Sequence, residues 1–584
     1  DFQFYRPMTL ALTRAFARPN GTFPALEMHA FQIGVHLIVT VLAAQLARRL
    51  GFCRPAELPT FAALFGLYPL SHQAIVWTQA QQSWVIAATL VTLHLYLSAR
   101  RRRSPMLLGL SLVAYICTNG FHENGLQTAA FVFLIEVQRH RNLRRALRSA
   151  GPWAFALIGS AYLALWISMP KAGGITSIAF EPLAARYLSQ GLLYPLLPDP
   201  LRLPYWLALV GMVGLLGAVL RVSRDMWWAI WGLGWVIGQL FTAWAGLRYD
   251  YIALSWRFFY LSAFGVTLIW FGAFRSLWAD YRGWPLRALG YLGLLLIVVQ
   301  GVALIARANA LYTDGTTALA QAISVMADHG GDARLLFVNF PDRYEPKNPF
   351  YPIGYWGVTL APVVTELGEF AALSTGVAPD TDNWTVPSID WHAREAGPYV
   401  IDMRGGFVSE ASVYESALGA EAIYLTEHSP EGRMALRYSG TVTPGNDTGS
   451  QPALARFGDL AALLAIKVKA VKGGLDLELR WQALQTGKPT ETVFVHLLSP
   501  EGALLAQADG GPGRELLPLW AWRPGDVIVD PRLLVVDGGE LAPGAYGIAV
   551  GIYNWDIDQR VPAIGADGRL LLDDQFVVTG IEIP

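Results

Sequence analysis

The side chains most able to do chemistry in this sequence are ionisable groups in or beside strongly apolar segments. Such a group at membrane depth, or at the mouth of a membrane cavity, is energetically costly and therefore indicates a functional site. The candidates are Asp1, Arg6, Glu27, His29, His36, His72, Glu123, Arg186, Arg248, Asp250 and Arg257. Arginine holds phosphate through forked hydrogen bonds, and a carboxylate can take the proton of an attacking hydroxyl. A transferase built on this set would use a substrate that is activated on a lipid phosphate.

The same residues also have other chemical interpretations and a purely structural one. Arg6, Arg248 and Arg257 can also extend to lipid headgroups without binding a substrate. His29 and His36 lie seven positions apart on one helical face, but the absence of a third ligand argues against zinc. No metal site or cofactor is therefore expected, although a need for a divalent cation stays open. The sequence has no P-loop, no G-x-S-x-G and no H-E-x-x-H motif.

The elements that must position these groups are apolar helices in the first half of the chain. Of the 584 residues 53% are hydrophobic and only 15% are charged, whereas a soluble domain carries about 25% charged residues. The net charge of -1 excludes a basic nucleic-acid-binding surface. No charged side chain occurs between Leu58 and Ala99. Residues 1–310 are therefore predicted to form a multi-pass domain of about ten membrane helices, each needing roughly 20 apolar residues.

The arginines predict the orientation of this domain. Arginine-rich loops, such as 100–103 and 139–148, alternate with loops that contain few positive charges, which is the positive-inside pattern. It places the rich loops in the cytoplasm, and residues 1–24 and the chain after 307 outside it. We expect an inner (plasma) membrane protein of a bacterium, with its candidate residues near the external face. Because the first residues are external, either a helix preceding Asp1 or a cleaved signal segment is also expected.

The second half of the chain has the composition of soluble domains. Residues 311–440 alternate helical and strand patterns, which predicts an extracytoplasmic α/β domain. Residues 453–584 contain short alternating strands, and Lys472-Gly473-Gly474 predicts a hairpin turn between two of them. Such a series is typical of a β-sandwich. We expect three tryptophans to be exposed on the sandwich, Trp520, Trp522 and Trp555. The role expected for the sandwich is either sugar binding or that of a structural cap.

Several segments of the first half resemble one membrane family. Tyr5-Arg6-Pro7-Met8-Thr9 resembles the Y-R-P-L-t signature of bacterial relatives of protein O-mannosyltransferases, which include the transmembrane-and-tetratricopeptide mannosyltransferases of the C-type glycosyltransferase fold. Further resemblances follow in order at residues 27–36, 64–77, 121–125, 186–198 and 257–265. At five positions this chain differs from the residue that is usual in the family: Gln32 replaces Asn, Tyr68 replaces His, Gln73 replaces Glu, His122 replaces Lys and Trp256 replaces Glu. The acidic motif that the family carries upstream of Y-R-P is represented only by Asp1.

The resemblance implies a glycosyltransferase that uses a polyprenyl-phosphate sugar as donor and a glycan, lipid or protein as acceptor. Asp1, or an acidic residue before it, would be the base, with Glu123 supporting the site. The implied lipid-phosphate ligands are Arg6, Arg257, Arg248 and Arg186. The implied substrate pocket is lined by His29, Gln32, Tyr68, His72 and Trp77.

A second function class is compatible with the same residues. The altered motif positions and the single acidic residue at Asp1 favour a non-catalytic membrane subunit that retains the transferase fold and binds a partner membrane complex. A transporter is disfavoured because the sequence has no inverted repeat. The two remaining classes differ in one property that can be measured, which is binding of a lipid-linked sugar.

Overall fold

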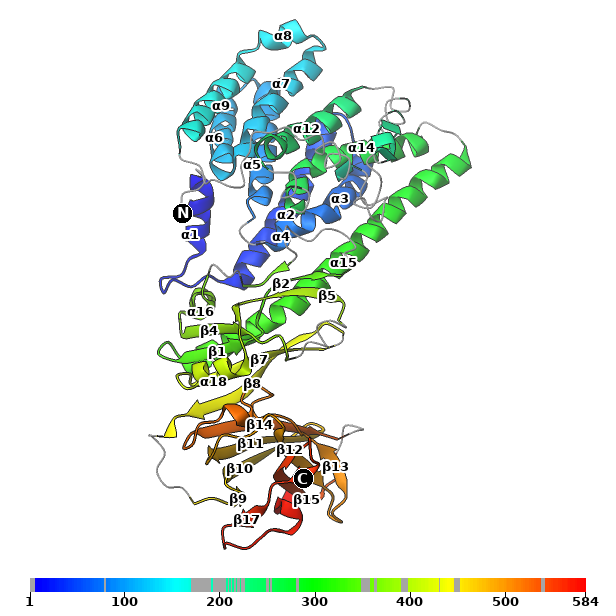
Figure 1. Ribbon diagram of the computed structural model, residues 1–584. Helices are drawn as coiled ribbons and strands as arrows, with labels where there is room; N and C mark the ends of the chain where they lie inside the picture. The colour runs from blue at the N-terminus through cyan, green and yellow to red at the C-terminus, as the bar shows by residue number, and fades with distance from the viewer. Residues whose placement is uncertain are drawn as a thin grey trace. The chain divides into compact units, whose positions relative to one another are not determined.

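The computed structural model describes most of the chain as two compact units (Figure 1). The described residues are 6–77, 80–169, 226–247, 255–279, 283–347, 358–361, 365–389, 397–429, 431–445, 452–536 and 541–583, with isolated positions between 191 and 252. The first unit contains residues 1–313 and 348–358, and the second contains residues 314–347 and 359–584. Helix α15 (Trp284–His329) contributes to both.

The first unit is helical, and five described helices are long and apolar enough to cross a bilayer. They are α2 (Ala25–Arg49), α5 (Gln82–Arg102), α9 (Ala150–Ser168), the segment Trp256–Trp278 that includes most of α14 (Phe259–Ala279), and α15. The shorter helices are α1 (Pro7–Phe16), α3 (Leu58–Gly66), α4 (His72–Val76), α6 (Pro105–Phe121), α7 (Gln127–His140) and α8 (Leu143–Leu147), and α12 (Trp227–Gly246) is a further helix of 20 residues. These helices are compatible with the membrane domain expected for this half. Of the ten expected spans, 205–220 lies partly outside the described residues.

Small and aromatic residues pack the centre of the helical unit. A Cβ atom on Gly265 in α14 would overlap the carbonyl oxygen of Gly232 in α12, so glycine allows these helices to approach closely. Trp235 stacks on Phe131 of α7 with ring centroids 4.1 Å apart. By contrast, Leu157 on α9 exposes 73% of its surface, as expected for a side chain that contacts lipid.

The two ends of this bundle carry different charges. At one end the last turns of α2, α5 and α7 meet: Arg49 donates to the carbonyl of His94 at 2.8 Å, and Arg100 pairs with the buried carboxylate of Glu136 at 2.9 Å. The exposed arginines at this end are Arg48, Arg49, Arg101, Arg102, Arg103, Arg139, Arg141, Arg144, Arg145 and Arg148. The opposite end holds the start of α5, the end of α6 and the start of α7. The bundle therefore has one arginine-rich end and one end with few positive charges.

The second unit contains a continuous ten-stranded sheet. Its order is β17-β9-β10-β11-β14-β8-β7-β1-β4-β6. The strands β1 (Arg334–Val338), β4 (Asp380–Thr385), β6 (Gly406–Phe407) and β7 (Ala422–His428) are parallel, and the helices α16 (Leu367–Thr375) and α18 (Glu410–Ala417) lie between them in the sequence. A smaller sheet joins β3 (Val358–Thr359), β2 (Pro341–Pro346) and β5 (Tyr399–Met403). This part has the α/β character expected for residues 311–440.

Strand β8 (Met434–Thr443) connects the α/β part to the strand-rich part. It pairs antiparallel with β7 through Tyr438 and Tyr424, and with β14 (Val527–Val535) through Thr441 and Val529. Gly440 has φ 110°, and a Cβ there would overlap the carbonyl oxygen of Val529. Glycine is thus required where β8 passes from one partner to the other. The α/β and sandwich regions therefore share one sheet within a single unit.

The remaining strands either complete the ten-stranded sheet or form a separate five-stranded sheet, and side chains from both sheets share one core, as expected for a sandwich. They are β9 (Ala455–Phe457), β10 (Ala461–Val471), β11 (Gly474–Ala483), β12 (Glu491–Leu498), β13 (Leu504–Gln507), β15 (Gly544–Asn554), β16 (Gln559–Arg560), β17 (Ala563–Gly565) and β18 (Phe576–Ile583). The predicted hairpin is confirmed, since β10 and β11 pair from Ala461↔Ala483 to Val471↔Gly474.

One expectation for the sandwich surface is wrong. Trp522 is buried, with 1% of its surface exposed, and its indole N–H donates to the carbonyl of Leu517 at 2.8 Å. The short 3-10 helix Leu519–Ala521 turns this ring into the core, where it lies beside Trp481 with centroids 6.5 Å apart. Trp520 is half-buried, and Trp555 is 58% exposed. Only Trp555 of the three is well exposed.

Candidate functional site

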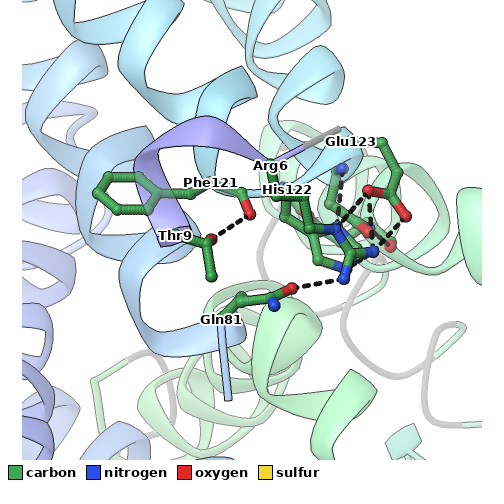
Figure 2. A network of polar contacts seen from close by, with 8 residues as sticks. Arg6, Thr9, Gln81, Phe121, His122 and Glu123 are labelled. Carbon is green, nitrogen blue, oxygen red and sulfur yellow. Dashed lines mark hydrogen bonds and ion pairs between the residues drawn. The ribbon is translucent and has the colours of Figure 1, made fainter. Parts of the chain in front are cut away.

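The candidate site is a network around Arg6, which Figure 2 shows from close by. It lies where α6 ends, opposite the arginine-rich end of the helical bundle. The guanidinium of Arg6 donates from Nη2 to Glu123 Oε1 at 2.7 Å and from Nε to Oε2 at 3.1 Å. Its Nη1 donates to Gln81 Oε1 at 2.6 Å, and Nη2 lies 3.1 Å from His122 Nε2. The side chains of Arg6 and Glu123 are 17% and 18% exposed. The site therefore combines one carboxylate, one guanidinium and one imidazole in a largely enclosed position.

Helix α1 brings Arg6 to this position. Pro7 occupies the first turn of α1, and Arg6 precedes it as the N-cap residue, so the fixed φ of proline starts the helix directly after the arginine. Thr9 Oγ1 donates to the carbonyl of Phe121 at 2.8 Å. A Cβ on Gly120 would lie 2.6 Å from Met8 Cγ, so a glycine there lets α1 pack against the end of α6. Residues 6–9 thus place Arg6 beside residues 122 and 123.

His122 ends α6 and turns its ring into the network. Its backbone is extended at φ -164° and ψ 146°, which stops the helix and starts the short turn Glu123–Leu126. Its Nδ1 accepts the backbone N–H of Asn124 at 3.2 Å, and only 4% of the residue is exposed. Burial, reinforced by the charge of Arg6, lowers the pKa of His122 to about 3. The imidazole is therefore neutral at physiological pH.

The buried neutral state of His122 predicts an acid-sensitive helical unit. Because its pKa lies below the ordinary value of 6.5, its contribution to stability is complete above pH 6.5 and is lost as the pH falls from 6.5 towards 3. The slope from this group approaches about 1.4 kcal/mol per pH unit. Thermal unfolding of wild type and His122→Asn between pH 7.5 and 4.5 checks this: the variant should lose less stability on acidification. Parallel pH profiles would contradict it.

The side chain of Glu123 is ionised in this structure. Burial by itself raises the pKa of Glu123, but the neighbouring His122 and the Arg6 guanidinium outweigh burial and lower the pKa to about 2. The forked contact with Arg6 is the geometry that binds carboxylates most strongly. A base with so low a pKa is weak, so Glu123 can accept a proton effectively only when Arg6 is engaged elsewhere.

Gln32 has a structural role in holding the loop beside this network. Its Nε2 donates to the carbonyl of Ala80 at 3.1 Å, and its Oε1 accepts from Ser83 Oγ at 2.7 Å and from Trp84 Nε1 at 2.8 Å. Gln81 follows Ala80 and reaches Arg6. Gln32 was expected to line the substrate pocket. Its hydrogen bonds instead hold the loop that positions Gln81.

Arg257 forms the second cationic centre of this unit. It lies in the 3-10 turn Trp256–Phe258, where its backbone N–H donates to Gln73 Oε1 at 2.9 Å. Its guanidinium stacks over Trp77 at 4.8 Å from the ring centroid, which is a cation–π contact. Arg257 is 9% exposed, whereas Trp77 is 48% exposed. The charge of Arg257 also lowers the pKa of His122. Arg6 and Arg257 therefore both influence the protonation of the same imidazole.

The structure does not bring all the predicted site residues together. His72 Nε2 lies 2.7 Å from Asn309 Oδ1, and Tyr68 donates to the carbonyl of Gly191 at 2.8 Å. His29 is exposed on α2. His36 contacts the hydroxyl of Tyr260 at 2.8 Å within the helix packing. Asp1, Arg186 and Arg248, together with Asp250, lie outside the described residues.

Gln81 and Asn124 were missed by the sequence reasoning. Gln81 is the acceptor for Arg6, and Asn124 supplies the N–H that fixes the ring of His122. The sequence did contain an indication for Gln81, because residues 79–83 form a polar run inside a strongly apolar region. Asn124 had no such signal, because its contact uses the backbone.

The side chains of the site determine which chemistry it can perform. The carboxylate can accept a proton, the two guanidinium groups can bind anionic oxygens, and the imidazole can donate or accept one hydrogen bond. Among the described residues, no three His, Cys, Asp or Glu side chains are close enough to hold a metal ion. No family model, curated protein or solved structure matches this chain significantly.

Proposed function

We propose that this chain is a membrane glycosyltransferase that moves a sugar from a polyprenyl-phosphate donor to an acceptor at the extracytoplasmic face. The observation that carries the proposal is the Arg6–Glu123–His122 network beside the Arg257–Trp77 pair. A carboxylate next to two enclosed cations suits a reaction in which a hydroxyl loses a proton and a phosphate leaves. The similarity of residues 5–9 and 121–125 to mannosyltransferase motifs supports the same reaction class.

The charge of the bundle supports the proposed orientation. Exposed arginines crowd the ends of α2, α5 and α7, and positive charge on short loops favours the cytoplasmic side. The Arg6 network lies at the opposite end of α5, α6 and α7. It would then face the extracytoplasmic side of the inner (plasma) membrane, where lipid-linked sugars rather than nucleotide sugars are the available donors.

Replacement of Arg257 by Ala tests the proposal. If its guanidinium binds the lipid phosphate, transfer from a polyprenyl-phosphate sugar should fall by about 10- to 100-fold, since a hydrogen bond to a charged group contributes about 1.5–3 kcal/mol. Arg14→Ala, which removes an exposed arginine of α1, is the matched control and should retain wild-type turnover. Unchanged turnover in Arg257→Ala would remove this residue from the site.

A specific observation also favours the alternative function. The two charged groups expected to act on substrate, Arg6 and Glu123, are paired with each other, as in a site that serves only stability. A non-catalytic subunit of a partner membrane complex would keep such a pair permanently closed. Purification with a stoichiometric membrane partner, together with no binding of a polyprenyl-phosphate sugar, would support this function and oppose the transferase.

A further inference from the structure

The segment that joins α7 to α9 carries positive charge that no carboxylate compensates. Residues 100–148 contain nine arginines and two acidic residues, Glu123 and Glu136. Glu136 is fully buried and is already paired with Arg100 at 2.9 Å, and Glu123 is paired with Arg6 in the network described above. Among the described residues, the exposed arginines of α8 and its last turn have no carboxylate partner: Arg144, Arg145 and Arg148. The first and last of these are four positions apart, a spacing at which like charges on a helix repel each other.

Helix α8 also exposes apolar side chains beside these charges. Leu143 and Leu147 are 56% and 43% exposed, and their spacing of four residues places them on one side of the helix. Trp153 is 59% exposed, and its indole N–H donates to the carbonyl of Leu147 at 2.7 Å. An exposed tryptophan ring whose N–H is hydrogen-bonded is typical of the headgroup level of a bilayer. The segment therefore combines cationic and apolar groups on one short surface helix, which Figure 1 shows between α7 and α9.

Contacts at both ends hold α8 in place while these side chains stay exposed. Arg141 ends α7 in a left-handed conformation with φ 50°, and its guanidinium stacks over Trp227 at 5.0 Å from the ring centroid. Asn142 caps α8, since its Oδ1 accepts the backbone N–H of Arg145 at 3.2 Å. Trp153 binds the other end of α8 to α9. A surface that is already ordered loses less conformational entropy when it binds a ligand.

We infer that residues 141–153 form a binding site for the headgroups of anionic phospholipids. The three unpaired arginines bind the headgroup phosphates, because the guanidinium fork matches the geometry of phosphate oxygens. The exposed leucines and the tryptophan lie at the boundary between the headgroups and the acyl chains. This site lies at the arginine-rich end of the bundle, away from the Arg6 network, and does not depend on the proposed sugar transfer.

Two features favour a lipid over a soluble anion as the ligand. The exposed leucines gain nothing from a small hydrophilic anion, whereas an amphipathic surface helix binds a bilayer through its apolar area and its cations together. The positive charge also extends beyond α8. Residues 101–103 at the end of α5 are exposed arginines, and the contact of Arg100 with Glu136 holds the end of α5 against α7. A surface of this extent matches a leaflet of anionic headgroups rather than one isolated ion.

Titration of the full chain in a neutral detergent with fluorescently labelled phosphatidylglycerol, and with the matching phosphatidylcholine, tests the site. Wild type should bind phosphatidylglycerol at least tenfold more tightly than phosphatidylcholine at low salt. This ratio should shrink at about 0.5 M salt, because the charges are then screened. Combined Arg144→Gln, Arg145→Gln and Arg148→Gln should weaken phosphatidylglycerol binding at least tenfold, since one arginine beside an anionic surface contributes a factor of about five.

Two matched variants separate the site from net charge and from folding. Replacement of the same three arginines by lysine keeps the charge and should retain most of the affinity. Replacement of three exposed arginines of the second unit by glutamine, at Arg433, Arg456 and Arg569, removes equal charge elsewhere and should leave binding like wild type. Unchanged phosphatidylglycerol binding in a monodisperse α8 glutamine variant overturns the inference, as does an equal loss in the second-unit control.

A soluble headgroup and a leucine variant distinguish a lipid from a free anion. Glycerol 3-phosphate carries the phosphate without acyl chains and should displace phosphatidylglycerol only weakly. Combined Leu143→Ser and Leu147→Ser should weaken phosphatidylglycerol binding about fivefold without changing its salt dependence, because apolar contact is lost but no charge. Complete displacement by glycerol 3-phosphate at equal concentration, or full affinity in the leucine variant, would assign the arginines to a soluble anion and overturn the lipid site.

Discussion

An Arg6→Ala variant is expected to destabilise the helical unit by about 3 kcal/mol, because removal of one partner leaves an enclosed, uncompensated charge on the other. The loss includes the contacts from Arg6 to Glu123 and Gln81. It should appear as a lower midpoint of thermal unfolding in detergent at pH 7. Arg14→Ala on the same helix removes an exposed cation and should change the midpoint little. An equal shift in both variants would show that the network contributes no specific stability.

A double variant separates stability from function in this pair. Arg6→Met with Glu123→Leu replaces both charges by apolar side chains, a change that is often neutral or stabilising for buried ion pairs. We expect it to regain most of the stability lost in Arg6→Ala and to remain inactive in sugar transfer. Recovery of transfer together with stability would mean that neither charge takes part in the reaction.

Asp530→Ala is expected to have the largest effect in the second unit, a loss of about 3–5 kcal/mol. Asp530 is fully buried and accepts Arg532 Nε at 2.9 and 3.0 Å and the N–H of Gly513 at 2.9 Å. Arg532 in turn donates to the carbonyls of Ala508 and Gly510. Without the carboxylate, the guanidinium stays buried and the loop 508–513 loses its anchor.

Hydrogen exchange can measure this loss locally. The amides of β14 should exchange faster in Asp530→Ala, whereas those of the helical unit should not change. Asp476→Ala on the neighbouring strand β11 removes an exposed carboxylate and serves as the control. Unaltered protection of β14 in Asp530→Ala would contradict the assigned role of the pair.

Local patterns predicted the elements whose contacts are close in sequence. Alternation around Lys472 predicted the β10–β11 hairpin, because strand period and turn residues are local properties. The apolar windows likewise predicted helices such as α2 and α5. Trp522 was misassigned because a three-residue 3-10 turn, which has no strong sequence signal, directs its ring inward.

The candidate site was predicted in its parts but not in its connections. Arg6 and Glu123 were both identified as unusual charges in apolar surroundings, yet 117 positions separate them. Their pairing depends on how α1 packs against α6 through Met8 and Gly120, which no local pattern reveals.

The strand β8 has a consequence for how the chain folds during synthesis. One edge of β8 can pair with β7 as soon as Thr443 has been made, but its other partner, β14, follows only after β9 to β13. Until then the α/β region presents an open strand edge, which is the kind of surface that recruits other chains. The final closure is a long-range pairing and is therefore expected to be slow. The need for glycine at residue 440 falls at this junction, so a larger residue there would prolong the time during which newly made chains can aggregate.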